Sequence, residues 1–183
     1  MELIGLFLVA CGLLVAAGVA KAIRPDDTAR ALAVVFPVPM RTVRTAVRLG
    51  SVAEALLGAA ALVVPRTASA SLVALSYAAF AVVVALVRSK GGAMASCGCF
   101  GTPDTPATAV HLVVNVGLAV SASAVALAAP AGTIVSILSQ EPWHGVPLIA
   151  LSALCGWLAY LAISALAALQ GARRLTAISF RSR

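Results

Sequence analysis

The chain has 183 residues, a net charge of +7 and 62% hydrophobic residues, while only 10% of its residues are charged. Its mean hydropathy of +1.06 excludes an ordinary soluble domain and indicates a multi-pass membrane protein. The positive charge does not require nucleic acid as a partner, because basic residues also mark the cytoplasmic side of membrane proteins.

Five stretches are long and apolar enough to cross a bilayer, since a membrane helix needs about 20 mostly apolar residues. The first follows Glu2 instead of a basic segment and reaches Lys21 without a cleavage pattern of small residues, so we expect it to be retained. The sequence predicts an all-α helical bundle forming a single integral membrane domain over residues 1–183, with a basic tail over 170–183. The predicted spans are residues 3–22, 46–64, 70–87, 109–129 and 146–169.

Two connections between spans are expected to lie along the membrane interface. In the first, over residues 24–45, the apolar piece 31–40 is too short to cross and contains Pro37 and Pro39. In the second, over residues 130–147, Trp143 is a candidate anchor at headgroup level. Four arginines of the first connection and just beyond it would then lie among headgroups and fix orientation: Arg30, Arg41, Arg44 and Arg48.

Basic residues are distributed very unevenly about the predicted spans. Of the 13 Lys and Arg residues, all but Arg66 fall on one side. We expect the protein to lie in the cell (cytoplasmic) membrane. The positive-inside rule then predicts that its amino terminus is outside and its carboxyl terminus is in the cytoplasm. The same rule places Cys97 and Cys99 near the cytoplasmic surface, although stable disulfides form mainly outside the cytosol.

Because consecutive spans run in opposite directions, polar residues from four of them should gather at one end of the bundle. That set is Lys21, Glu54, Cys97, Cys99, His111 and Asn115. An ionisable group such as Glu54 is costly inside a span and is by default a functional candidate that needs a partner, either Lys21 or His111. The alternative is an inert ion pair that locks two helices together.

His111 and Asn115 are four residues apart and so share one side of the fourth span. Directed toward the cysteines, they would hold and polarise a sulfur, since a histidine or a nearby cation lowers the pKa of a thiol. The alternative is that His111 reaches headgroup water and Asn115 bonds to another helix.

Cys97 and Cys99, separated by Gly98, have three interpretations. The first is thiol–disulfide exchange, in which one thiolate attacks a partner's disulfide and the other cysteine resolves the mixed disulfide. The second is a Cu(I) site formed with Met94, whereas a closed zinc site would lack ligands. The third is a pair of small buried residues in a tight turn.

Cys11 and Cys155 are predicted at matching depth in the first and fifth spans. A transmembrane electron relay would need such a match, but single cysteines in Ala- and Leu-rich helices usually serve as small packing residues.

The run Cys97-Gly98-Cys99-Phe100-Gly101, with Asn115 in the next span, resembles the methylamine utilisation protein E (MauE) family. The similarity covers about residues 3–129 and includes the segments 18–21 and 53–54, although Val114 stands where such a family commonly has arginine. The span over 146–169 would then be an addition. The resemblance implies a DoxX-like, redox-associated membrane protein that works with thioredoxin-like partners in maturing exported proteins.

The sequence therefore predicts a thiol–disulfide exchange protein that passes redox equivalents between Cys97, Cys99 and a thioredoxin-fold partner. Glu54 or His111 would tune protonation and Lys21 would favour the thiolate. A quinone is a candidate oxidant for the pair, although nothing in the sequence identifies a pocket for it. The alternatives are a non-catalytic accessory subunit of a larger membrane complex and a protein that handles Cu(I) through Met94 and the cysteine pair.

Overall fold

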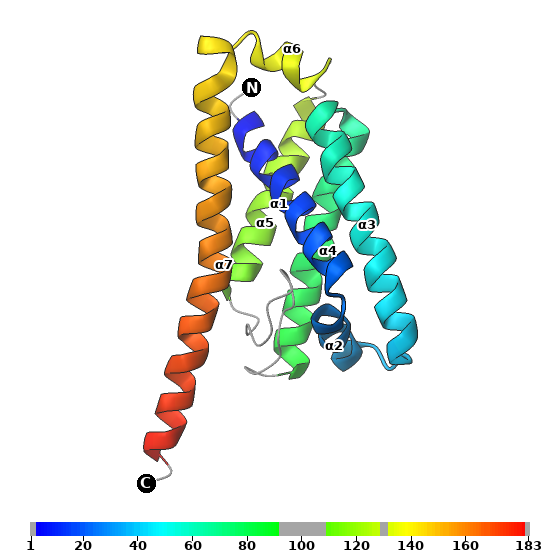
Figure 1. The fold of residues 1–183 in the computed structure, drawn as a ribbon, viewed down its shortest axis with the longest axis vertical. Helices are drawn as coiled ribbons and strands as arrows, with labels where there is room; N and C mark the ends of the chain where they lie inside the picture. Colours follow the sequence, from blue (N-terminus) through cyan, green and yellow to red (C-terminus); the bar gives the residue numbers. More distant parts are fainter. Residues whose placement is uncertain (1–2, 92–108, 129–131, 182–183) are drawn as a thin grey trace.

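The computed structural model describes residues 3–91, 109–128 and 132–181 (Figure 1). Within these ranges every regular element is a helix, which confirms the predicted all-α class. In chain order the helices are α1 (Ile4–Ile23), α2 (Asp26–Val35), α3 (Met40–Val63), α4 (Thr67–Gly91), α5 (Ala109–Ala128), α6 (Ile134–Leu138), the short 3-10 helix η2 (Pro142–Gly145) and α7 (Val146–Arg181).

Five segments of the described chain are long and apolar enough to cross a membrane, as the sequence predicted. The protein is therefore a multi-pass membrane protein in contact with the lipid bilayer. The segments are Ile4–Ile23, Met40–Val63, Thr67–Ser89, Ala109–Ala128 and Pro142–Ala162.

The α3 and α7 helices extend furthest beyond their predicted spans, whereas α4 exceeds its predicted span 70–87 by about one turn at each end. The α3 helix begins at Met40, directly after Pro39, and so takes in arginines that the hydropathy pattern assigned to the preceding connection. The α7 helix continues to Arg181 instead of ending near residue 169, so much of the predicted basic tail is helical. The positions of the prolines explain both differences. Pro39 sets the start of α3, and no proline follows Pro147 to interrupt α7.

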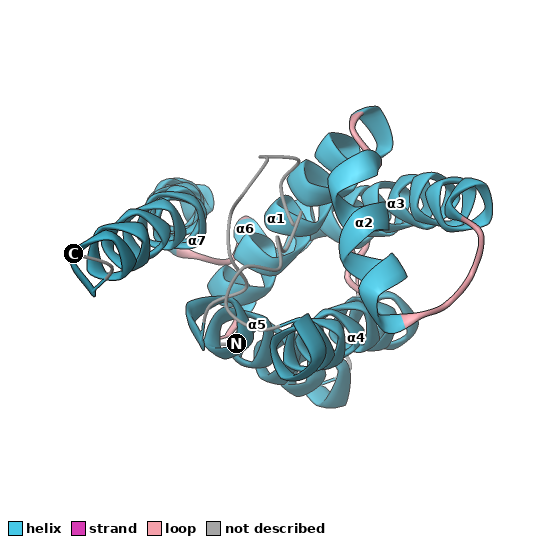
Figure 2. Ribbon diagram, turned by 90° about the horizontal axis from the view of Figure 1, so that it is seen from below, coloured by secondary structure: helices cyan, strands magenta, loops and turns pink. Residues whose placement is uncertain are grey.

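The predicted interfacial connection contains the short helix α2. Asp26 and Asp27 lie in its first turn, where negative charge interacts favourably with the helix dipole. The helix stops before Pro37, and the chain turns back into α3. Packed against α3 and α4, α2 crosses one end of the bundle (Figure 2). We call this the α2 end; α1 and α4 finish there, and α3 and α5 begin there (Figure 1).

The α1 helix is the centre of the bundle, lying between α3 and α7 and also packing against α5 (Figure 1). Its buried face carries Phe7, Cys11 and Leu14 into the main apolar core. Two hydrogen bonds fasten it: Tyr77 Oη on α4 donates to the Ala10 carbonyl oxygen at 2.6 Å, and Ser152 Oγ on α7 donates to the Gly5 carbonyl oxygen at 3.2 Å.

Candidate functional site

The closest charged pair within the spans joins α1 to α3. Lys21 Nζ lies 2.5 Å from Glu54 Oε2, so Glu54 has one of the two partners that the sequence offered. The Lys21 side chain is 7% exposed and that of Glu54 is 21% exposed. Charges taken out of water need a partner at this range, so each group makes the burial of the other tolerable.

Small residues allow α1 and α3 to approach closely at this pair. A Cβ atom at Gly18 would lie 2.7 Å from the Ser51 carbonyl oxygen and 2.8 Å from the Ala55 backbone nitrogen. Further along, a Cβ at Gly58 would lie 2.9 Å from the Cys11 carbonyl oxygen. Glycine at these positions is therefore what permits backbone contact, as is common between membrane helices. Gly18 lies one turn before Lys21, so the close approach of the two backbones brings the Lys21 ammonium group within contact distance of Glu54.

Two aromatic rings of α4 complete the surroundings of the ammonium group. Lys21 Nζ lies over the Phe80 ring, 4.1 Å from its centroid, which is a cation–π contact. The Tyr77 ring meets Phe80 edge to face at a centroid distance of 5.9 Å. Because the Tyr77 hydroxyl is held by α1, the Phe80 ring is positioned by a neighbour that is itself fixed. Neither ring was predicted from the sequence as part of the site.

A cavity of about 390 Å³ adjoins the ion pair between α1, α2, α3 and α4. Its walls are mostly apolar and consist of aliphatic side chains with the Phe36 and Phe80 rings. The polar residues of the lining are Lys21, Glu54, Ser51, Thr28 and Thr42. The site is thus an apolar chamber with a small polar region, which is the usual composition of a small-molecule site.

Two further ion pairs at the α2 end involve α2. Asp27 pairs with Arg30 on the same helix, and Asp26 pairs with Arg44 of α3. Arg48 Nε donates to the Ala22 carbonyl oxygen at 3.3 Å, near the last turn of α1. The Asp26–Arg44 pair therefore holds α2 to α3 beside the cavity, and the two aspartates offset part of the positive charge around it.

His111 and Asn115 are both buried on one side of α5, at 1% and 8% exposure. Asn115 Nδ2 donates to the His111 carbonyl oxygen at 2.7 Å, so the amide bonds within its own helix. The shared face predicted for the two residues is therefore present.

The four cysteines fall into two groups. Cys97, Cys99 and the alternative copper ligand Met94 lie outside the described residues. Cys11 and Cys155 are free thiols; Cys11 is fully buried in the main core and Cys155 packs against that core. In the described ranges no three His, Cys, Asp or Glu side chains form a group that could hold a metal ion.

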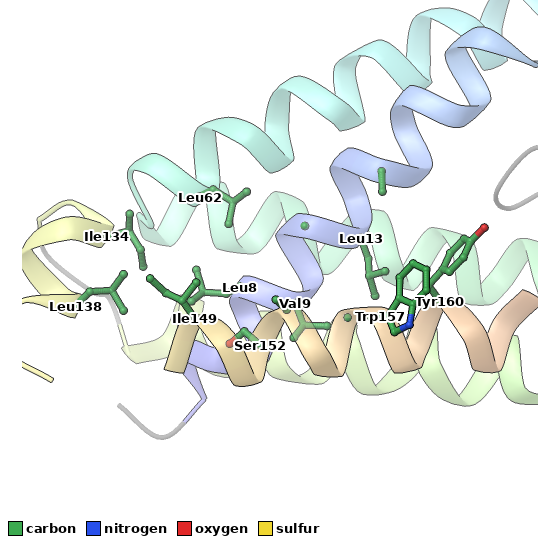
Figure 3. Close-up of a pocket in the computed structure, with 14 residues that line it drawn as sticks. Leu8, Val9, Leu13, Leu62, Ile134, Leu138, Ile149, Ser152, Trp157 and Tyr160 are labelled. Carbon is green, nitrogen blue, oxygen red and sulfur yellow. The ribbon is translucent and has the colours of Figure 1, made fainter. Parts of the chain in front are cut away.

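A second cavity, of about 650 Å³, lies mainly between α1 and α7, and neither Lys21 nor Glu54 lines it (Figure 3). Leu8, Val9 and Leu13 of α1 face Ile149 and Trp157 of α7 across it (Figure 3). Its lining is mostly apolar and carries no ionisable side chain apart from Tyr160, although Ser152, Trp157 and Tyr160 bring hydrogen-bonding groups to it.

Comparison with curated proteins and with solved structures finds no match. The family model described as methylamine utilisation protein MauE matches residues 1–129. This match includes α1 to α5, and hence Lys21, Glu54, Phe80 and the cysteine pair, whereas α7 follows it. With five membrane-spanning segments and a match over most of its length, the chain belongs to the MauE family.

Proposed function

We propose that the protein is a membrane thiol–disulfide exchange protein acting through Cys97 and Cys99. The observation that carries this proposal is the spacing of two thiols one residue apart, in the segment that links α4 to α5. A disulfide across a single glycine would be strained and hence easily reduced, which suits a carrier of redox equivalents.

The exchange needs no oxidant or reductant other than the disulfide of the partner protein. One thiolate attacks a disulfide of a thioredoxin-fold partner, forming a mixed disulfide and releasing one partner thiolate. The second cysteine then attacks the mixed disulfide, so that the partner leaves as a dithiol and Cys97 and Cys99 become linked. Two electrons pass to the partner, and the reverse sequence returns them.

The ion pair at the α2 end supports a role in proton handling. In this proposal Lys21 favours the thiolate, since a nearby cation stabilises it, and Glu54 or His111 takes up the proton. Lys21, Glu54 and His111 are on helices that end or begin at the α2 end, and the cysteine segment joins α4 to α5 at the same end. The physiological setting we propose is the maturation of exported proteins.

Trapping of mixed disulfides tests the function directly. In membranes from cells that express Cys97→Ser or Cys99→Ser, we expect at least one variant to accumulate an adduct with a thioredoxin-fold protein that dithiothreitol releases. The missing cysteine can no longer resolve the intermediate. Cys155→Ser, which removes a free thiol of α7, is the matched control and should accumulate no adduct.

The outcome also separates the alternatives. If neither serine variant traps a redox partner and the double variant retains full activity, the protein is an accessory subunit with structural cysteines. Stoichiometric copper on the protein purified under reducing conditions, lost in Cys97→Ser, would instead support Cu(I) handling.

A further inference from the structure

The cavity beside Lys21 and Glu54 has a chemistry that limits what it can bind. Its two charged side chains form an ion pair at 2.5 Å, so they cancel and leave no net charge for an anion or a cation to neutralise. Its volume of about 390 Å³ falls within the range of about 300–1,000 Å³ typical of small-molecule sites. The charge balance favours an uncharged ligand.

Polar groups in the cavity retain hydrogen-bonding capacity. Ser51 is 3% exposed, lines the cavity, and its hydroxyl has no hydrogen-bond partner among the described residues. Lys21 Nζ has three donors, and within the described chain its hydrogen-bond acceptor is Glu54. A hydrocarbon chain would leave these groups unsatisfied, which is costly in a buried site. The ligand should therefore carry hydrogen-bond acceptors.

The remaining walls indicate a flat, lipophilic ligand. The Phe80 and Phe36 rings line the same cavity, together with aliphatic side chains of α2 and α3. Aromatic rings pack favourably against flat rings. An uncharged ring matches the zero net charge of the cavity and packs against its aromatic walls. Carbonyl oxygens on the ring accept hydrogen bonds from the available donors, and an apolar tail contacts the aliphatic side chains. We propose that this cavity binds the head group of a lipophilic quinone.

The proposal goes beyond thiol exchange and does not depend on it, because it uses only described residues of α1 to α4 and of the connection between α2 and α3. The test uses the full chain in phosphatidylcholine nanodiscs and a short-chain ubiquinone analogue as the probe. We expect saturable binding in excess of that to empty nanodiscs. Absence of that excess would overturn the proposal.

Glycine variants locate the bound quinone. Nothing lies within 4 Å of a Cβ built at Gly50, Gly12 or Gly117, so a side chain can be added at each position without a clash at its Cβ. Gly50 lines the proposed site and Gly12 lines the apolar cavity of Figure 3. Gly50→Leu should raise the Kd about tenfold or more by filling the site. Gly12→Leu and Gly117→Leu should leave the Kd unchanged.

Two results would refute this location. Wild-type affinity in Gly50→Leu would show that the quinone does not occupy the site, and loss of binding in Gly12→Leu would move it to the other cavity. Phosphatidylglycerol added to the nanodiscs should not displace the quinone. If it does, the cavity takes an anionic headgroup and the proposal fails. Failure here would leave the mixed-disulfide experiment unaffected.

Discussion

Lys21 and Glu54 are the residues whose chemistry departs most from their surroundings. A lysine with its side chain 7% exposed at the end of a membrane helix has lost most of its hydration, and Glu54 at 2.5 Å replaces part of it. The Phe80 ring beneath the ammonium group adds attraction without adding charge. The pair therefore holds α1 to α3 while keeping a polar group available inside the cavity.

Removing one partner of this pair should destabilise the protein. We expect Lys21→Met to lower the free energy of unfolding by about 3–5 kcal/mol, because it leaves a largely buried carboxylate unpaired. The double variant Lys21→Met, Glu54→Met should recover most of the loss, since no unpaired charge remains. Thermal unfolding in detergent measures both effects.

The control for this prediction is an exposed ion pair of the same protein. Asp26 and Arg44 have side chains 51% and 55% exposed, and exposed pairs contribute about 0–1 kcal/mol. Asp26→Asn should therefore shift the unfolding temperature little. Equal losses of unfolding free energy in Lys21→Met and Asp26→Asn would show that burial of the Lys21 pair does not affect stability.

Part of this site was predictable from the sequence. Glu54 is recognisable because an acid within an apolar span is rare, and the antiparallel order of the spans leaves Lys21 and His111 as its two candidate partners. The choice of Lys21 depends on the packing of α1 against α3. Phe80 was not predictable, because an aromatic residue within a span is ordinary and its contact with Lys21 depends on how α4 packs. The cavity was likewise unpredictable, since it requires the position of α2.

At the scale of helices, the contact between α1 and α3 depends on missing side chains. Gly18 meets the α3 backbone where a Cβ would be 2.7 Å from an oxygen atom, a distance that real Cβ atoms do not adopt. Hydropathy indicates five spans, but it does not show which helix faces are in contact. It also does not show where a helix continues into polar residues beyond its apolar stretch. The start of α3 at Met40 and the extension of α7 to Arg181 were missed for this reason.

A single methyl group at Gly18 should test this contact. Alanine normally stabilises a helix relative to glycine by about 1 kcal/mol, but at Gly18 it must push α1 and α3 apart. We expect Gly18→Ala to destabilise the protein by about 1–3 kcal/mol in thermal unfolding, the range for overpacking. Gly117→Ala, where a Cβ meets open space, should be neutral or stabilising. A stabilised Gly18→Ala would contradict the close approach.

At the scale of the whole molecule, the two ends of the bundle differ in charge. The α2 end carries Arg24, Arg30, Arg41, Arg44 and Arg48, whereas Arg66 is the basic residue between α3 and α4 at the opposite end. We propose that the α2 end faces the cytoplasm, because basic residues are retained on that side of a membrane. A dithiol attached there would meet reducing conditions, so it would have to act as a transient carrier of electrons.

Labelling with an impermeant maleimide tests this orientation. In a background with Cys11→Ala and Cys155→Ala, Cys97 and Cys99 should resist labelling in intact spheroplasts and react in inverted vesicles. Gln140→Cys, made with all four native cysteines replaced, should show the reverse, because Gln140 is exposed in the connection at the opposite end. Labelling of Cys97 or Cys99 from outside would invert the topology. The charge asymmetry would then have failed as a guide, and the dithiol would lie in the compartment where stable disulfides form.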